Sequence, residues 1–173
     1  MTTGTNAIAN DKHGKPRPAV SADVLVLENF LPYRLSVLAN RASDALAREY
    51  TQRFALGVTE WRVMSVLGRH PDLSANAVAR RTAMDKVAVS RAVNRLLASG
   101  RLQRRIDPDD RRRSLLRLSR AGRAVYAQVV RIALDFEREL LAGVAAAERV
   151  QLFRLLDRLD ELELRARAEA ASG

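Results

Sequence analysis

The stretch from Asp85 to Leu118 constrains the fold of this chain more than any other. Between Asp85 and Ser99, apolar residues recur three or four positions apart, which predicts an α-helix with one buried face. These apolar residues are Val89, Ala92, Val93, Leu96 and Leu97. Asp85 is a suitable N-cap and Gly100 a suitable terminator, so the sequence predicts a helix bounded by these two residues.

Two short strand-like runs follow this helix. They are Leu102–Ile106 and Ser114–Leu118, and the Asp-Pro-Asp-Asp sequence between them is typical of a turn. The sequence therefore predicts a β-hairpin with an arginine-rich tip directly after the helix. A helix with a basic polar face followed by such a hairpin is the pattern of a winged helix-turn-helix.

The excess positive charge of the chain is confined to this region. From Arg80 to Arg131 there are 15 Lys and Arg against 4 Asp and Glu, a net charge of +11, whereas the whole chain has a net charge of +10. A phosphate backbone favours such a confined basic surface, because each neutralised phosphate releases condensed counterions. We therefore expect the partner of this region to be double-stranded DNA.

Two shorter helices are expected before the Asp85 helix. Thr59 is placed to cap a helix over Glu60–Arg69, and Ser74 is placed to cap a short helix that ends at about Arg81. The short link from there to Asp85 gives helix-turn-helix spacing. This spacing alone fits an ordinary helical hairpin equally well, so the confined charge and the following β-hairpin are what favour DNA binding.

Long amphipathic helices are expected on both sides of the basic region. One spans about Leu25 to Phe54 with Gly57 ending it, another runs from a Ser119 cap to Gly143, and a last one spans about Ala145 to Ala168. In the last helix we expect five apolar residues to face inward: Val150, Phe153, Leu156, Leu159 and Leu162. Because these helices carry more apolar surface than one chain can bury, we expect a homodimer.

The expected organisation is one mainly helical domain between two flexible ends. It comprises a disordered tail at residues 1–22, a single domain at residues 23–168 and a flexible C-terminus at residues 169–173. Within the domain, we expect dimerisation helices at about residues 25–54 and 119–168, and the winged helix-turn-helix at about residues 57–118.

Several other classes of protein are disfavoured by the composition. The chain has no cysteine, no run of 18 apolar residues and no hydrophobic signal region, so we expect no thiolate metal site, membrane span or export, and a cytoplasmic setting fits. Its two histidines, His13 and His70, fall in the expected tail and in a turn, and no Gly-rich phosphate loop or paired-carboxylate site stands out. We therefore expect neither an enzyme nor a cofactor.

The order of these elements resembles the MarR family of bacterial transcriptional regulators, from about Leu27 to Leu164. The most specific part is DPDDRRRSLLRLSRAGRAV, which is similar to the wing signature of the family and its step into the next helix. That step is Leu118-Ser119-Arg120-Ala121-Gly122, where Ser replaces the usual Thr and keeps the capping hydroxyl. The resemblance implies a mainly α fold with a small β-wing, in which long N- and C-terminal dimerisation helices flank the winged helix-turn-helix.

The resemblance also implies a role for the tip of the wing. Asp110 and Arg112 take the places of the family's aspartate and of the arginine that enters the minor groove. Arg111 and Arg113 flank Arg112, so the inserted arginine is any of these three. A narrow minor groove concentrates negative potential, which suits a guanidinium. The alternative is that Asp110 and Arg112 form only a surface ion pair.

Further candidates for DNA contact lie on the two helices of the helix-turn-helix. Short side chains near the start of the second helix let it approach base edges, hydroxyl and amide groups hydrogen-bond bases, and arginines bind guanine or phosphate. The candidates are Ser74, Asn76, Lys86, Ala88, Ser90, Arg91, Asn94 and Arg95. Val89 belongs to the apolar series, so we expect it in the core instead.

A small-molecule pocket is implied by the resemblance where the dimerisation helices meet the DNA-reading part. Its lining would be Phe30, Tyr33, Arg34, Val37, Leu38, Trp61, Met64, Ser65 and Val129, with Val125 and Ile132 beside them. Arg34 stands among apolar positions, where an unpaired guanidinium is costly. A ligand carboxylate or phosphate, an acidic residue of the chain or a snorkelling position would each satisfy it.

The resemblance thus implies a ligand-responsive transcriptional regulator, most often a repressor, that binds a palindromic operator as a homodimer. Its effector would be an aromatic acid or its CoA thioester. The alternative is an architectural protein that binds DNA without regard to sequence and needs no effector.

Overall fold

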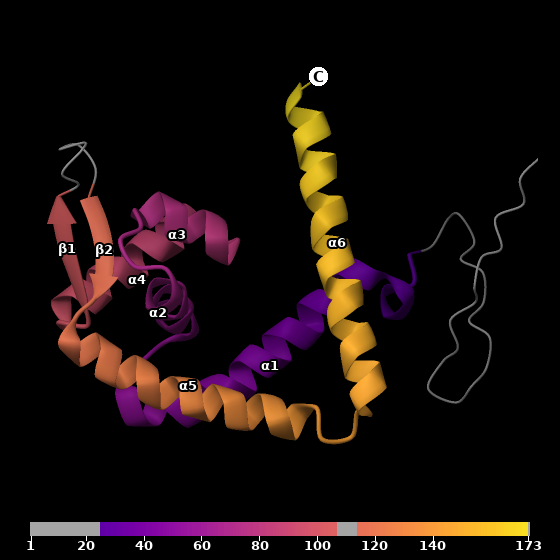
Figure 1. Cartoon of the computed structure of the whole chain (residues 1–173), viewed down its shortest axis with the longest axis horizontal. Coiled ribbons are helices and arrows are strands. Elements are labelled where there is room, and N and C mark those ends of the chain that lie inside the picture. Colours follow the sequence, from indigo (N-terminus) through magenta and orange to yellow (C-terminus); the bar gives the residue numbers. More distant parts are fainter. Residues whose placement is uncertain (1–24, 107–113, 173) are drawn as a thin grey trace, which may run out of the picture. The chain divides into compact units, whose positions relative to one another are not determined.

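The computed structural model describes residues 25–106 and 114–172, and the chain divides into two compact units, residues 1–43 and 44–173. In the first unit, a short 3-10 helix η1 (Leu27–Asn29) precedes the start of α1 (Leu31–Phe54). The second unit contains the end of α1 followed by α2 (Val58–Arg69), α3 (Ala75–Thr82), α4 (Lys86–Ala98), β1 (Leu102–Ile106), β2 (Ser114–Leu118), α5 (Arg120–Leu140) and α6 (Ala146–Ser172), as Figure 1 shows.

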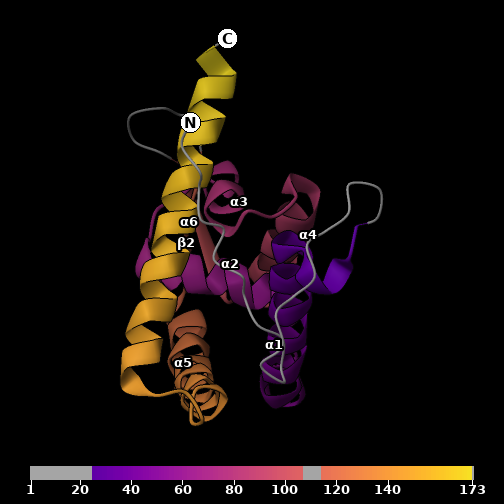
Figure 2. The same cartoon turned by 90° about the vertical axis from the view of Figure 1, so that its right-hand side faces the viewer.

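The core of the second unit lies among α2, α3, α4 and the two strands, an arrangement that Figure 2 shows from a second direction. The apolar face of α4 that the sequence predicts is buried, with Val89, Ala92, Val93 and Leu96 each at most 1% exposed. It meets buried residues of α2 and α3, namely Val63, Met64, Leu67 and Val78. Burial of this face fixes which side of α4 is left to the solvent.

The wing is an antiparallel hairpin with the strand bounds that the sequence predicts. Leu102 pairs with Leu118 and Ile106 with Ser114, and Leu73 forms an isolated bridge to Leu116. The turn between the strands, with Asp110, lies outside the described residues, as does the expected tail. The prediction of a mainly helical fold with a small β-wing is confirmed.

The junction between α1 and α2 differs from the sequence prediction. α1 begins at Leu31 after the 3-10 helix, and it ends because Ala55 adopts a left-handed φ of 48°, before Gly57 is reached. Gly57, rather than Thr59, is the N-cap of α2, since its N–H donates to Glu60 Oε2 over 2.6 Å. The prediction of a Thr59 cap was wrong because a backbone N–H and a glutamate supply this cap without a hydroxyl.

The C-terminal helices differ from the sequence prediction in their bounds, and α6 exposes apolar side chains. α5 ends at Leu140, before Gly143, and α6 extends beyond Ala168 to Ser172. The residues expected to face inward are exposed in the single chain: Val150 is 60% exposed, Phe153 48%, Leu156 36%, Leu159 37% and Leu162 53%. They are exposed because α6 has no extensive contact with another helix or strand among the described residues. That these residues face inward in a dimer stays a prediction.

A close approach fixes the start of α5. Ser119 caps the helix as predicted, because its Oγ accepts the Gly122 N–H over 2.9 Å and donates to the Gly100 carbonyl over 2.6 Å. A Cβ on Gly122 would lie 1.9 Å from the carbonyl oxygen of Arg101. The absence of a side chain at Gly122 therefore lets α5 start directly against the turn between α4 and β1.

None of the described helices combines the length and the hydrophobicity that a bilayer crossing requires.

Candidate nucleic-acid interface

The start of α4 is fixed by the carboxylate of Asp85. Its Oδ1 accepts the N–H groups of Val87 over 2.8 Å and of Ala88 over 3.0 Å, which satisfies two of the unpaired donors of the first turn. The predicted cap is therefore confirmed. Because the opposite face of α4 is buried, this N-terminus presents its polar face to solvent in a defined rotation.

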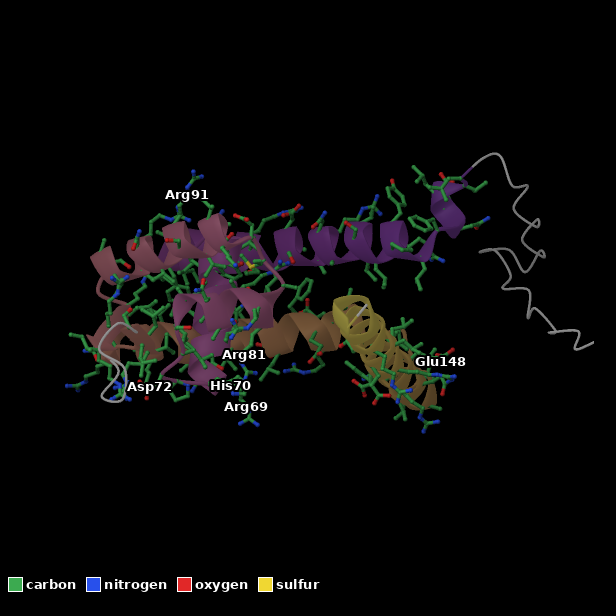
Figure 3. All side chains as sticks on the ribbon, turned by 90° about the horizontal axis from the view of Figure 1, so that it is seen from above. Arg69, His70, Asp72, Arg81, Arg91 and Glu148 are labelled. Carbon is green, nitrogen blue, oxygen red and sulfur yellow. The ribbon has the colours of Figure 1, made fainter. Side chains whose placement is uncertain are left out.

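The predicted contact residues of α4 share this exposed face. Lys86, Ser90, Arg91, Asn94 and Arg95 are exposed, and Ala88 is half-buried. Ser90 and Asn94 are one helical turn apart, as are Arg91 and Arg95, so the face carries two adjacent rows. Figure 3 shows the Arg91 side chain projecting away from the ribbon. The structure thus brings the amide, the hydroxyl and the cations together on one surface.

Val87 lies on the same exposed part of α4, and sequence reasoning missed it. Its side chain is 55% exposed, although its neighbour Val89 is buried at 1%. An exposed apolar group at the start of such a helix suits contact with a thymine methyl. The signal in the sequence was that Val87 falls outside the apolar series that begins at Val89.

The start of α3 is also placed as the sequence predicts. Ser74 is the N-cap, and its Oγ accepts the Ala77 N–H over 3.2 Å. Asn76 is exposed in the first turn. A phosphate is well suited to this position, because free N–H groups and the helix dipole favour an anion there.

Arg95 has an intramolecular partner that the sequence did not indicate. Its Nε donates to Glu60 Oε1 over 2.5 Å, and the other oxygen of Glu60 caps α2 through Gly57. Glu60 is only 8% exposed, whereas the Arg95 side chain is 60% exposed. The pair therefore holds the guanidinium at the edge of the α4 surface and ties the rotation of α4 to the start of α2.

The base of the wing is held by Asp72, an aspartate that the sequence analysis did not single out. Asp72 Oδ1 accepts from Arg117 Nε over 2.9 Å and from Arg105 Nε over 3.0 Å, and Oδ2 accepts from Arg117 Nη2 over 2.6 Å. One carboxylate thus joins the turn between α2 and α3 to both strands. The hydrogen bond from Arg117, with that from Arg105, holds the pKa of Asp72 below its ordinary value of 3.8.

We expect Asp72→Asn to lower the free energy of unfolding at neutral pH. The ionised carboxylate stabilises the folded chain, so its contribution is complete above pH 3.8 and is lost as the pH falls through the depressed pKa. Urea unfolding of the parent and of Asp72→Asn from neutral to acid pH measures this contribution. The difference between the two should shrink with acidification, and a difference that does not depend on pH would contradict the role of the charge.

The residues predicted for the tip of the wing, Asp110, Arg111, Arg112 and Arg113, lie outside the described residues. Their placement therefore stays a prediction.

The residues predicted for an effector pocket fall into two groups. In the second unit, Trp61 is half-buried, Met64 and Val129 are fully buried in the core, and the Ser65 hydroxyl donates to the Trp61 carbonyl. In the first unit, Phe30, Tyr33, Arg34 and Leu38 are exposed and Val37 is half-buried. Because Arg34 is exposed in the single chain, the cost of burying its guanidinium does not arise there. The grouping of these residues around a ligand stays a prediction.

An aromatic cluster surrounds Trp61. The ring centroid of Trp61 lies 5.9 Å from that of Tyr50 and 5.8 Å from that of Tyr126. Burial raises the pKa of Tyr50 to about 12, so its phenol is neutral across the physiological range. The cluster joins the end of α1, α2 and α5 within the second unit.

Comparison with known proteins adds an independent line of evidence. The family model that matches residues 56–113 is that of the MarR family. A relative from Thauera aromatica, a putative transcriptional regulatory protein for the hcr operon, is 27% identical over 152 residues, which cover 86% of this chain and 91% of that protein.

Two solved structures share the fold over nearly their whole length. A MarR/EmrR family transcriptional regulator from Acinetobacter sp. ADP1 is 30% identical with a TM-score of 0.74, over 82% of this chain and 99% of that one. The PcaV transcriptional regulator from Streptomyces coelicolor, in complex with its natural ligand, is 26% identical with a TM-score of 0.67, over 80% and 96%. The chain therefore belongs to the MarR family of DNA-binding transcriptional regulators, which are not enzymes.

Proposed function

We propose that this protein is a cytoplasmic repressor that binds a near-palindromic operator as a homodimer and is released by a small anionic aromatic ligand. Members of the family bind DNA as dimers and can bind small molecules. In this proposal residues 23–168 form one domain, in which the helices at its two ends carry the dimer contacts.

The observation that carries the proposal is the exposed polar face of α4. Five neighbouring positions on it are exposed: Lys86, Ser90, Arg91, Asn94 and Arg95. An α-helix with these exposed polar and basic side chains fits the major groove, where an asparagine pairs with adenine and an arginine with guanine. The Asp85 cap and the buried opposite face hold these groups in place before DNA arrives, which reduces the entropy lost on binding.

The exposed apolar side of α6 supports a dimer. Leu152, Leu155, Leu159 and Leu162 are 37–53% exposed and recur at alternating spacings of three and four residues. This spacing is typical of helices that pack against one another. A two-fold dimer would present two α4 helices to successive major grooves, so half-sites should lie about one helical turn apart.

The proposed division of labour assigns base reading to part of the α4 face, phosphate contacts to the rest of that face and to α3, and a minor-groove contact to the wing. Lys86, Arg91 and the α3 residues Ser74 and Asn76 would contact phosphates, while Ser90 and Asn94 would contact bases. One of Arg111, Arg112 and Arg113 would enter the minor groove, with Asp110 orienting Arg112.

The effector part of the proposal rests on family likeness and on the aromatic cluster. The PcaV regulator binds a natural ligand in its crystal structure. Here the proposed ligand is an aromatic acid or its CoA thioester, and Trp61 would lie against its aromatic part. The dimer would have one conformation in which the spacing of the two α4 helices fits DNA and another in which it does not. The ligand releases DNA only if it binds the second conformation more tightly than the first.

Selection of bound duplexes from a random pool, followed by footprinting, tests this proposal. We expect two inverted half-sites about one helical turn apart, both protected. A single protected half-site, or a bound set without symmetry, would count against a dimeric operator-binding protein.

A further inference from the structure

Glu60 is a nearly buried acid whose two carboxylate oxygens bind two different helices. Oε2 accepts the Gly57 N–H at the start of α2 over 2.6 Å, and Oε1 accepts from Arg95 Nε of α4 over 2.5 Å. The Glu60 side chain is only 10% exposed, and each of its oxygens has a partner. The carboxylate is therefore held in place, so it fixes the position of the guanidinium that it binds.

Arg95 is the exposed member of this pair. Its side chain is 60% exposed, and the pair uses only the Nε–H among the five N–H groups of the guanidinium. Within the part of the chain that the structure describes, no other residue accepts a hydrogen bond from Arg95. Nη1 and Nη2 are thus available to a partner at the edge of the exposed α4 face, beside the start of α2.

We infer that Glu60 is a positioning residue, which orients Arg95 so that its two terminal nitrogens bind one phosphate of the DNA backbone. A guanidinium presents its N–H groups in a fixed fork that matches two oxygens of a phosphate. The edge of the α4 face suits this contact, because phosphates border the major groove whereas base edges form its floor. The inference rests on the function proposed above and gives Arg95 a phosphate contact beside that of Arg91.

The effect of Glu60 on DNA affinity should have the opposite sign to that of a plain negative charge. An acid beside a basic surface repels DNA, so Glu60→Gln should tighten binding if only the charge matters. If Glu60 positions Arg95, this variant should weaken binding, because DNA must then order a free guanidinium. The order of one long side chain corresponds to about a twofold to tenfold loss of affinity.

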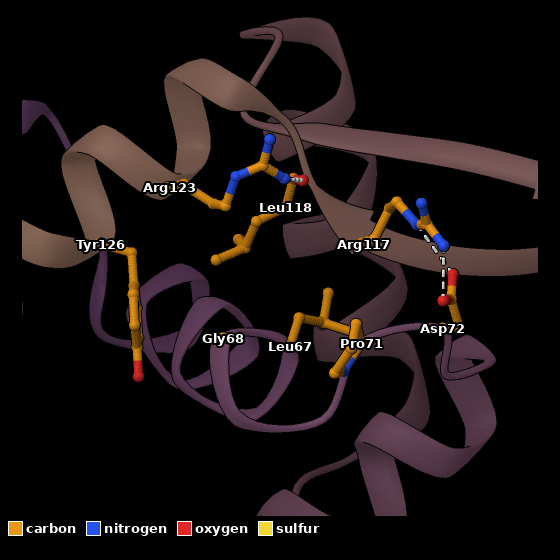
Figure 4. A pocket seen from close by; sticks show the side chains of 8 residues that line it. All are labelled: Leu67, Gly68, Pro71, Asp72, Arg117, Leu118, Arg123 and Tyr126. Atoms are coloured by element: carbon orange, nitrogen blue, oxygen red, sulfur yellow. Dashed lines mark hydrogen bonds and ion pairs between the residues drawn. The ribbon is translucent and has the colours of Figure 1, made fainter.

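The first measurement needs no DNA. In heteronuclear NMR spectra of the full chain, we expect Glu60→Gln to move the Nε–H signal of Arg95, assigned with Arg95→Ala, to the position of an unpaired arginine. Arg105 and Arg117 are internal controls, because their Nε groups donate to Asp72 instead. Figure 4 shows the pair of Asp72 and Arg117. The signals of these two arginines should not move.

The second measurement locates the phosphate. Affinities are compared for duplexes from the random-pool selection in which single phosphates are replaced by neutral methylphosphonates. We expect one position in each half-site where this replacement weakens binding of the parent but has little effect on Glu60→Gln or Arg95→Lys. Lysine keeps the positive charge without the fork, so a plain charge contact would survive in Arg95→Lys.

Two controls separate the pair from other effects of Glu60. Glu49→Gln removes one negative charge from an exposed residue of α1 and should not weaken DNA binding. A double-mutant cycle separates the pair from the cap of α2, because Glu60→Gln should cause no further loss of affinity in a chain that carries Arg95→Ala. Additive losses would show that Glu60 acts through the Gly57 cap and would overturn the inference.

Three further results would overturn it. They are an unchanged Arg95 signal in Glu60→Gln, tighter DNA binding by this variant, and coupling of Arg95 to a guanine that lacks N7 instead of to a methylphosphonate. The last result would make Arg95 a base-reading residue. Equal affinity of the parent for selected and random duplexes would instead refute the operator function. The NMR signal and the sign of the Glu60→Gln effect would still test the inference, since they require no particular DNA sequence.

Discussion

Replacing Gly122 by alanine is expected to lower the free energy of unfolding by about 3 kcal/mol or more, the upper end of the cost of inserting a methyl group into a packed site. The added Cβ would lie 1.9 Å from the carbonyl oxygen of Arg101. That oxygen belongs to the backbone and also accepts the Ser119 N–H over 2.9 Å, so it cannot move without weakening the hydrogen bond that positions the capping residue Ser119. Urea unfolding followed by circular dichroism measures the effect.

Gly143→Ala is the matched control for this prediction. No atom lies within 4 Å of an added Cβ at Gly143, and this glycine has no positive φ. Alanine there restricts the unfolded chain, so we expect no loss of stability and a gain of up to about 1 kcal/mol. Equal destabilisation by Gly122→Ala and Gly143→Ala would contradict the close approach at the start of α5.

Replacing Asn94 by alanine is expected to abolish discrimination at particular base pairs of the selected duplex. A bidentate contact to one base is worth about 1–3 kcal/mol, so the preference at those positions should fall by about tenfold to a hundredfold. Asn94 is exposed on α4 and turned away from the core, so the fold should be unaffected. Affinities for a set of single base-pair variants of the duplex measure the change.

Arg112→Ala serves as the contrast. Loss of a backbone or minor-groove cation should weaken binding to most sequences alike and reduce its dependence on salt. If Asn94→Ala and Arg112→Ala both merely scaled all affinities by one factor, the assignment of base reading to α4 would be wrong.

Local sequence patterns predicted the parts of the fold that depend on near neighbours. The apolar series from Val89 to Leu96, the caps at Asp85, Ser74 and Ser119, and the strand bounds are all confirmed. Each rests on helical or strand periodicity or on a hydrogen bond that spans about three residues. Such interactions are visible in the order of residues along the chain.

The features that were missed depend on residues far apart in the sequence. Asp72 binds Arg105 and Arg117, and Glu60 binds Arg95, but no local pattern indicates which charges meet in space. The sequence analysis noted Gly122 only as part of a motif. Only the structure shows that the Arg101 carbonyl leaves no room for a side chain at this position. The apolar side chains predicted to face inward on α6 are exposed in the single chain. Their burial requires a partner surface, so it stays a prediction.

The central claim is that α4 and the wing bind duplex DNA of a particular sequence. Competition binding tests this claim most directly. The affinity for the selected duplex is compared with that for random duplex of equal length, at one near-physiological salt concentration. We predict a ratio above about a thousand, as is typical of specific regulators. A ratio near one would contradict the claim and would indicate an architectural protein that binds DNA without regard to sequence.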